Sequence, residues 1–152
     1  MESTSLSCAC GQVFLILMGP PILSAECACA SCRQAAQRLR DGLGIDLQEQ
    51  NDTTRFVLFR KDRVQTGPGK LAELRLTPKS GTRRVIATCC NTPLFLEFTQ
   101  GHWLSLYGKL WPPGALPLLE TRTMVMDHPE PAQLSADVQN SRGHSVWFMA
   151  RL

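Results

Sequence analysis

The chain has 152 residues and a formal net charge of +3, with 43% hydrophobic and 19% charged residues. These values exclude an intrinsically disordered chain, which has fewer apolar residues and a higher net charge. No apolar run reaches the ~18 residues of a membrane span. The first residues also lack the basic and apolar segments of a secretory signal. We therefore expect one globular domain over residues 1–152, located in the cytoplasm.

Short apolar runs between turn residues predict a mainly β fold with one short helix. The expected strands are, in chain order, residues 13–18, 22–29, 55–59, 70–77, 82–88, 94–98, 102–107 and 121–126. The segment 102–107 also fits a short helix, as does 134–138. The main helix is expected to begin at Ser31, which has capping-box spacing to Gln34, and to end at residues 41–44.

The seven cysteines fall into three tight groups, and this grouping is the main chemical signal of the chain. An odd number of cysteines without a secretory signal argues against a disulfide framework and favours metal or thiol chemistry in a reducing compartment. The groups are Cys8/Cys10, Cys27/Cys29/Cys32 and Cys89/Cys90.

The central group has the pattern C-x-C-x-x-C. In an extended backbone, residues two apart point to the same side, so Cys27 and Cys29 can present their sulfurs together. The C-x-x-C step from Cys29 to Cys32 is the usual turn by which two sulfurs bind one zinc. Three sulfurs leave a fourth position of the ion open, and an open position is typical of catalytic rather than structural zinc.

The other four cysteines form two pairs that are far apart in the sequence, and together they predict a structural zinc. One ion shared by Cys8, Cys10, Cys89 and Cys90 would close a loop of about eighty residues and offset chain entropy. Neighbouring residues on a regular strand point to opposite sides, so Cys89 and Cys90 require a sharp turn, which Asn91 permits. Cys89 is assigned as the fourth ligand by ligand count. The alternatives are that it faces the central cluster or is a free thiol.

Basic residues are frequent in the middle of the chain, without the clustered signature of a nucleic-acid binder. Solvated edge strands explain them, and an anionic ligand or nucleic acid is the alternative. They are Arg55, Arg60, Lys61, Arg63, Lys70, Arg75, Lys79, Arg83 and Arg84. None of the three histidines, His102, His128 and His144, has metal-ligand spacing to the cysteines.

Three linked motifs resemble those of the glutathione-dependent formaldehyde-activating enzymes and their relative, centromere protein V. The motifs begin at Cys8 (C-A-C-G), Cys27 (C-A-C-A-S-C-R) and Cys90 (C-N-T-P-L). The resemblance covers residues 5 to about 98. The chain departs from the family's closing C-x-x-C motif, because position 87 is Ala87 and the extra cysteine is Cys89 instead.

The resemblance implies a β-tent fold of small antiparallel sheets stapled by zinc, with two metal sites. Cys8, Cys10 and Cys90 would bind a structural zinc, and Cys27, Cys29 and Cys32 a catalytic one. It further implies carbon–sulfur lyase chemistry on glutathione adducts of formaldehyde or similar thiol adducts. Arg33, one residue past a ligand, is a candidate partner for a substrate carboxylate, with a solvated helix arginine as the alternative.

Three hypotheses about function follow from these observations. In the first, the chain is a zinc-dependent carbon–sulfur lyase that takes a small thiol such as glutathione. In the second, it is a non-catalytic zinc-stapled binding module. In the third, it is a thiol or metal sensor whose exposed central cluster loses zinc on oxidation. Zinc binding itself is common to all three. The sequence names no substrate and leaves the oligomeric state open.

Overall fold

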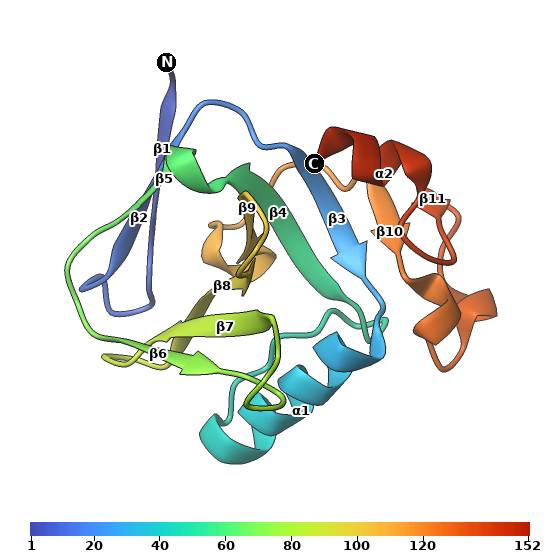
Figure 1. The fold of residues 1–152 in the computed structure, drawn as a ribbon, viewed down its shortest axis with the longest axis horizontal. Helices are drawn as coiled ribbons and strands as arrows, with labels where there is room; N and C mark the ends of the chain where they lie inside the picture. The colour runs from blue at the N-terminus through green and yellow to red at the C-terminus, as the bar shows by residue number, and fades with distance from the viewer.

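The structure is a computed structural model that describes all 152 residues, with two β-sheets and two α-helices (Figure 1). The strands are β1 (Ser3–Ser7), β2 (Phe14–Met18), β3 (Leu23–Cys27), β4 (Thr54–Arg60), β5 (Val64–Thr66), β6 (Leu71–Leu74), β7 (Thr82–Ala87), β8 (Thr92–Phe98), β9 (Trp103–Tyr107), β10 (Thr121–Thr123) and β11 (Gln139–Asn140). The α-helices are α1 (Ala30–Leu43) and α2 (Val146–Arg151). Neither helix has the length and apolarity that a membrane crossing requires.

The strands form a three-stranded sheet, β1-β2-β5, and an eight-stranded sheet, β11-β10-β3-β4-β9-β8-β7-β6. The predicted mainly β class with one main helix is confirmed. The antiparallel pairing that the resemblance implies is present in both sheets except at one edge of the larger sheet, where β10 runs parallel to both β3 and β11. The parallel pairing arises because the irregular segment after β9 returns the chain to the beginning of β3, where the amide of Glu120 donates to the carbonyl of Ser24 (2.9 Å), before β10 begins.

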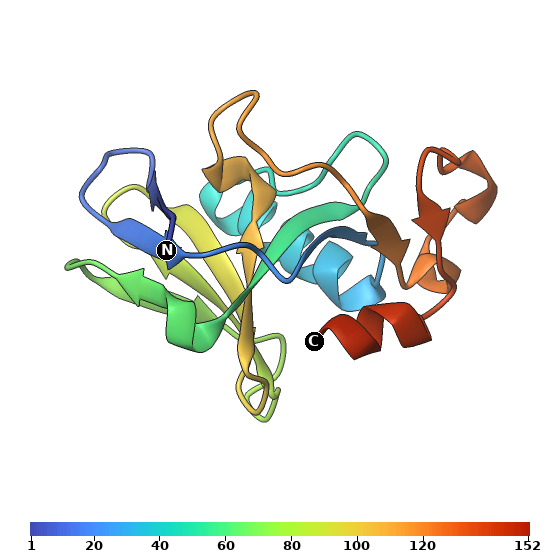
Figure 2. The same ribbon diagram turned by 90° about the horizontal axis from the view of Figure 1, so that it is seen from above.

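The larger sheet has a separate apolar core on each face, and β4 shows how its sequence produces them. Successive side chains of a strand point to opposite faces. Val57 and Phe59 pack against the three-stranded sheet, whereas Phe56 and Leu58 pack toward the helices. The larger sheet therefore lies between the smaller sheet on one side and α1 and α2 on the other, an arrangement that can be followed in Figures 1 and 2.

Helix α1 begins one residue before the predicted Ser31, because a cysteine caps it. Cys29 is the N-cap residue, and its Sγ accepts the amide proton of Cys32 at 3.3 Å. The predicted capping box that starts at Ser31 is therefore wrong. The predicted end is confirmed, since the helix terminates at Gly44 in the left-handed region (φ +67°).

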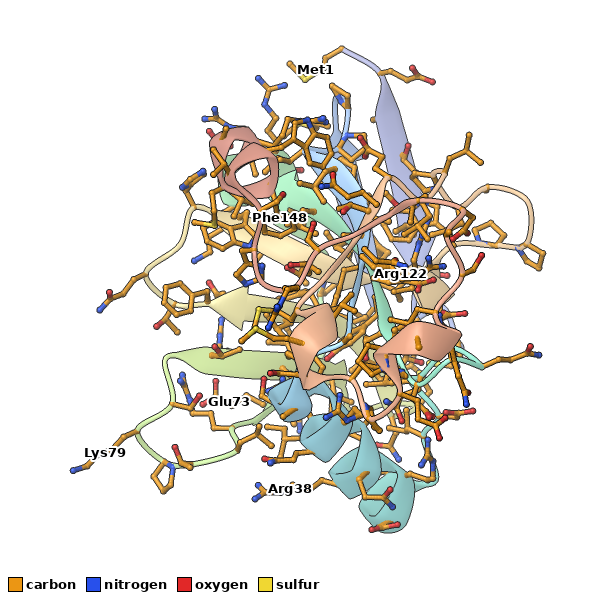
Figure 3. All side chains as sticks on the ribbon, turned by 90° about the vertical axis from the view of Figure 1, so that its right-hand side faces the viewer. Met1, Arg38, Glu73, Lys79, Arg122 and Phe148 are labelled. Carbon is orange, nitrogen blue, oxygen red and sulfur yellow. The ribbon has the colours of Figure 1, made fainter.

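Helix α2 is not predicted by the sequence, and it covers part of the second core. Ser145 Oγ caps it by accepting the amide proton of Phe148 at 3.0 Å. A helix of six residues is too short to be stable alone, so the packing of the buried Phe148 holds it in place (Figure 3). The predicted helix at 134–138 is absent, and the ambiguous segment 102–107 forms strand β9.

A buried ion-pair network joins β3, β10 and the loops beside them. Arg122 Nε donates to Glu26 Oε2 at 2.8 Å, and Arg122 Nη1 donates to Asp137 Oδ1 at 2.6 Å. Glu26 also accepts from Thr53 Oγ1 (2.9 Å) and Asn51 Nδ2 (3.1 Å). These bonds satisfy the buried charges and hold the short parallel pairing of β3 and β10.

Replacement of Arg122 by Met is expected to destabilise the fold by about 3–5 kcal/mol, because it leaves the carboxylate of Glu26 buried without its partner. Urea unfolding measures the loss. The control is Arg60→Met, which breaks the exposed pair with Asp62 (2.7 Å) and is expected to leave the urea midpoint almost unchanged. Equal effects of the two substitutions would contradict a structural role for the network.

Candidate metal centres

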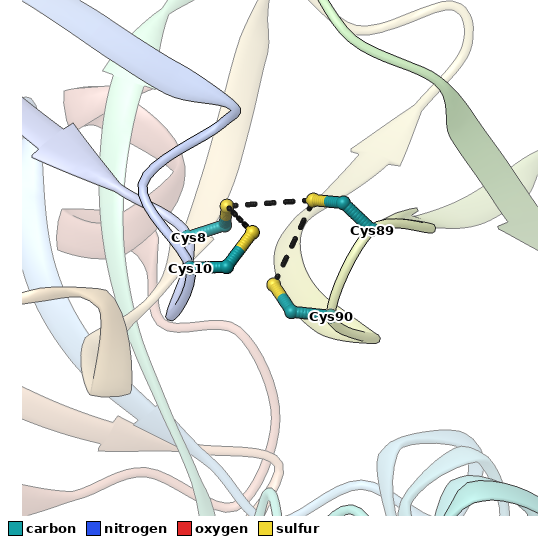
Figure 4. A group of neighbouring side chains, drawn as sticks. All are labelled: Cys8, Cys10, Cys89 and Cys90. Atoms are coloured by element: carbon teal, nitrogen blue, oxygen red, sulfur yellow. Dashed lines mark hydrogen bonds between the residues drawn. The ribbon is translucent and has the colours of Figure 1, made fainter.

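Four thiols from two distant segments meet at one point between the β1–β2 turn and the β7–β8 turn (Figure 4). The sulfur of Cys8 lies 3.6 Å from that of Cys10 and 3.7 Å from that of Cys89. The sulfurs of Cys89 and Cys90 are 3.8 Å apart. All four sulfurs lie within 4.8 Å of one another, and Cys8 is buried while Cys10 and Cys89 are exposed.

The two turns that carry these thiols depend on residues in the left-handed region. Gly11 has a φ of +79° and lets the chain reverse after Cys10. Asn91 has a φ of +56° and completes the turn after Cys90. The amide of Ala9 donates to Thr92 Oγ1 at 3.0 Å and ties the two turns together. The sharp turn predicted at Cys89 and Cys90 is thus present.

This four-sulfur geometry fits a tetrahedral metal ion. A zinc–sulfur bond of about 2.3 Å places the four sulfurs of a regular tetrahedron about 3.8 Å apart. The three sulfur–sulfur distances given above, 3.6 to 3.8 Å, agree with that value. Cys89 lies with this group rather than with the central cluster, so the group offers one ion four thiol ligands.

The second group consists of Cys27, Cys29 and Cys32, whose sulfurs also lie within 4.8 Å of one another. Cys27 ends β3, Cys29 caps α1, and Cys32 lies in the first turn of α1. The group contains no fourth cysteine, histidine or carboxylate within that distance. A metal ion held here by the protein would therefore have three thiolate ligands and one open position.

Negative charge in this group is concentrated on one sulfur. Hydrogen bonds from Cys27 and Cys32 lower the pKa of Cys29 to about 2. The bond to Cys29 raises the pKa of Cys27 well above its usual value. The bond with Cys27 lowers the pKa of Cys32, but the effects of Cys29 and of burial outweigh it and raise that pKa to about 12. In the absence of metal, Cys29 is thus the thiolate and its neighbours remain thiols.

A cavity of about 380 Å³ opens onto the three-cysteine group. One face of five consecutive strands, β3, β4, β9, β8 and β7, forms most of its wall, and α2 closes another side. Of its 18 lining residues, 12 are hydrophobic when the three cysteines are included, so apolar side chains form much of the wall beside the sulfurs. The apolar wall includes Phe56, Leu58, Leu96, Phe98, Trp103 and Phe148.

His144 lines the cavity, although its sequence position gave no indication of this. Its Nδ1 lies 2.7 Å from Thr123 Oγ1, and its ring stacks on Phe148 with 4.8 Å between ring centres. Thr123 Oγ1 also donates to the carbonyl of Gly143 at 3.1 Å. With its proton used in that bond, the hydroxyl accepts from Nδ1–H, which leaves Nε2 as a proton acceptor. Burial lowers the pKa of His144, which favours the neutral ring.

Two arginines near the cluster have different surroundings. Arg33 donates to the carbonyls of Ala28 (2.6 Å) and Asp127 (2.5 Å) and does not line the cavity. Arg84 lines the cavity with only 2% of its surface exposed, and its Nη2 lies 3.3 Å from the carbonyl of Ser31 and 4.0 Å from Cys32 Sγ. The interpretation of the basic residues as solvated is therefore wrong for Arg84 and for Arg55, which is also buried.

Comparisons of the chain with protein-family models and with curated protein sequences find no match.

Two metal ions per chain are expected, and the two groups are expected to bind them independently because they share no ligand. Elemental analysis of the purified protein measures the metal content. The triple variant Cys27→Ser, Cys29→Ser, Cys32→Ser is expected to keep one metal and the circular dichroism spectrum of the unmodified chain. A metal content that does not change in the triple variant would contradict binding at the central group.

Metal binding at the central group is expected to release about two protons near neutral pH, because Cys27 and Cys32 are thiols before binding and thiolates after it. Apparent affinity is therefore expected to rise about a hundredfold per pH unit until those thiols ionise. Calorimetric titration of the metal-free protein in buffers of different ionisation enthalpy measures the release, with the triple variant subtracted. Release of three protons would show that Cys29 is also a thiol.

Proposed function

We propose that the chain is a zinc-dependent carbon–sulfur lyase that acts on adducts of a thiol with a small aldehyde. One observation carries the proposal. Three thiols converge without a fourth protein ligand, and a cavity of about 380 Å³ opens onto them. A structural site has its four ligands from the protein, whereas a site with three ligands and access for a small molecule is typical of catalysis.

The proposed reaction joins or separates a thiol and an aldehyde. In the direction of synthesis, the thiol sulfur attacks the carbonyl carbon and a carbon–sulfur bond forms. The carbonyl π-bond breaks, and its electron pair goes to the oxygen. The proton lost by the thiol is returned to that oxygen, so the product is a hydroxymethyl thioether when the aldehyde is formaldehyde. The lyase direction reverses each step, and no oxidant or reductant is needed.

The protein's own residues would hold the ion and move the proton. Cys27, Cys29 and Cys32 are the ligands, and zinc, when bound, supplies a Lewis acid that lowers the pKa of an incoming thiol. His144 Nε2 is the proton acceptor in the cavity, and the Thr123 hydroxyl fixes the ring through Nδ1. The apolar wall would limit the contact of a bound adduct with water.

The motif resemblance described under Sequence analysis supports the same proposal. Glutathione and formaldehyde are the substrates that the resemblance implies. The four-cysteine group brings together the thiols that the family pattern leads us to expect as ligands, with Cys89 in place of a cysteine at position 87. We extend the family's chemistry to this chain as a proposal, with Cys8, Cys10, Cys89 and Cys90 holding the structural zinc.

A thiol sensor is the second candidate, and the close approach of three sulfurs favours it. Two thiols within 4.8 Å can be oxidised to a disulfide by peroxide, which would release the ion. Peroxide-dependent zinc release that is reversed by a reductant would support the sensor. If the protein binds two zinc ions but shows neither turnover nor reversible zinc release, the result would favour the non-catalytic binding module.

Turnover is measured as consumption of formaldehyde in the presence of an excess of thiol, with the zinc-loaded protein. Cys29→Ser is expected to abolish the protein-dependent rate, because it removes a ligand of the central ion. His144→Gln is expected to lower kcat/KM by about 10² to 10⁴, the usual contribution of a positioned acid or base. The control is His102→Gln, a histidine outside the cavity, which is expected to keep the full rate. A full rate in Cys29→Ser would contradict the proposal.

A further inference from the structure

We infer that the thiol taken by this site is a compact molecule with an apolar body and one carboxylate, bound by Arg84, rather than glutathione. The inference rests on the proposed function, because it concerns the substrate of the same cavity. It depends on two features of that cavity, its single permanent cation and its apolar wall.

Arg84 is the only arginine or lysine that lines the cavity, and no aspartate or glutamate lines it. Arg84 is 2% exposed, and its contacts with the carbonyl of Ser31 and with Cys32 Sγ are both made by one nitrogen, Nη2. Nε and Nη1 make no hydrogen bond of normal geometry within the protein, although the guanidinium also approaches the buried hydroxyl of Tyr107. Arginine presents its N–H groups in a planar fork that fits a carboxylate. Arg84 is thus positioned to receive an anionic group.

The place of Arg84 relative to the sulfurs limits the length of the ligand. Because Nη2 lies 4.0 Å from Cys32 Sγ, a carboxylate bound to Arg84 lies within a few bond lengths of the three-cysteine group. A thiol whose carboxylate is one or two carbons from its sulfur can therefore reach both. In glutathione, each carboxylate is separated from the sulfur by a longer peptide backbone.

The charge of Arg84 also favours an anionic fourth ligand. Zinc with three thiolates carries a net charge of about −1, which disfavours a further thiolate. A buried guanidinium beside Cys32 offsets that charge, and it acts in a region from which water is largely excluded. Arg84 thus acts on two groups of the ligand, the sulfur and the carboxylate.

The apolar wall selects the rest of the ligand. Phe56, Leu58, Leu96, Trp103 and Phe148 offer surface for an alkyl or aromatic group. Glutathione has an ammonium, two carboxylates and two amides, and the cavity has one cation and no acid to pair with them. Burial of charged groups without partners is costly, so this wall disfavours glutathione and favours an apolar thiol.

The test measures thiol binding rather than turnover. Cobalt replaces zinc, and the absorption of the cobalt ion changes when a fourth sulfur binds at the central group. The four-cysteine group already provides four sulfurs, so the absorption of cobalt bound there is not expected to change when a thiol is added. Four thiols are titrated: α-mercapto-β-phenylpropionate, which has both features, phenethyl mercaptan, which lacks the carboxylate, thiolactate, which lacks the ring, and glutathione. The ring and the carboxylate are each expected to improve affinity by at least about tenfold.

The variants are Arg84→Gln, Arg84→Lys and, as the matched control on the same strand, Arg83→Gln. Arg83 does not line the cavity and instead pairs with Glu97 (2.5 Å) and Glu73 (3.1 Å). Arg84→Gln is expected to remove the advantage of the carboxylate, so that α-mercapto-β-phenylpropionate and phenethyl mercaptan bind within about twofold of each other. Arg84→Lys is expected to keep part of the advantage, and Arg83→Gln all of it.

Each outcome decides for or against the inference. Glutathione binding as tightly as α-mercapto-β-phenylpropionate to the unmodified chain would overturn it, and this comparison needs no variant. Persistence of the carboxylate advantage in Arg84→Gln, with two metals still bound, would also overturn it. In both cases the proposed function survives, because a thiol has bound. If none of the four thiols changes the cobalt spectrum, the open position itself is refuted, and the proposed function fails together with the inference.

Discussion

The closeness of two sulfurs that are far apart in the sequence is the constraint on which the rest of the structure depends. Cys8 and Cys89 are 81 positions apart, yet their sulfurs are separated by 3.7 Å. Closing a loop of this length costs entropy, and a shared cation would supply the compensating free energy. The same contact attaches the three-stranded sheet to the end of β7. Strand β7 also carries Arg84, whose side chain points to the opposite face of the sheet, into the cavity. The four-cysteine group therefore also helps to fix the position of Arg84.

Because side chains alternate along the strands, one face of the larger sheet forms a packed core and the other face lines the cavity. On β7, Val85 and Ala87 enter the core beneath the smaller sheet, whereas Arg84 and Ile86 face the helices. The neighbouring strands repeat this division, so one face of the larger sheet is close-packed and the other is left partly open over the cysteines. Residues that face the cavity can therefore change without disturbing the core beneath the smaller sheet.

Much of this architecture could be predicted from local sequence patterns, and the failures have physical reasons. The main strands, the end of α1 and the sharp turn at Asn91 follow from apolar runs and turn residues that act locally. The sequence pattern does not predict strand β1, because only Leu6 is buried in it, nor helix α2, because so short a helix depends on the tertiary packing of Phe148. The position of His144 in the cavity is not predicted either, because it depends on the same tertiary packing, in which the His144 ring stacks on Phe148. For Arg84 a signal existed, because two adjacent arginines on one strand must point to opposite faces.

The capping of α1 by Cys29 makes the backbone sensitive to the state of the sulfur cluster. The amide proton of Cys32 is bound to the same sulfur that would ligate an ion, at 3.3 Å. A bare thiolate, a metal-bound thiolate and an oxidised sulfur differ in how strongly they accept that proton, and a weak cap lets the first helical turn fray. The exchange rate and chemical shift of one amide therefore report on the chemistry of the central group. The amide of Cys32, where α1 meets the three-cysteine group, can therefore serve as a spectroscopic probe of that group.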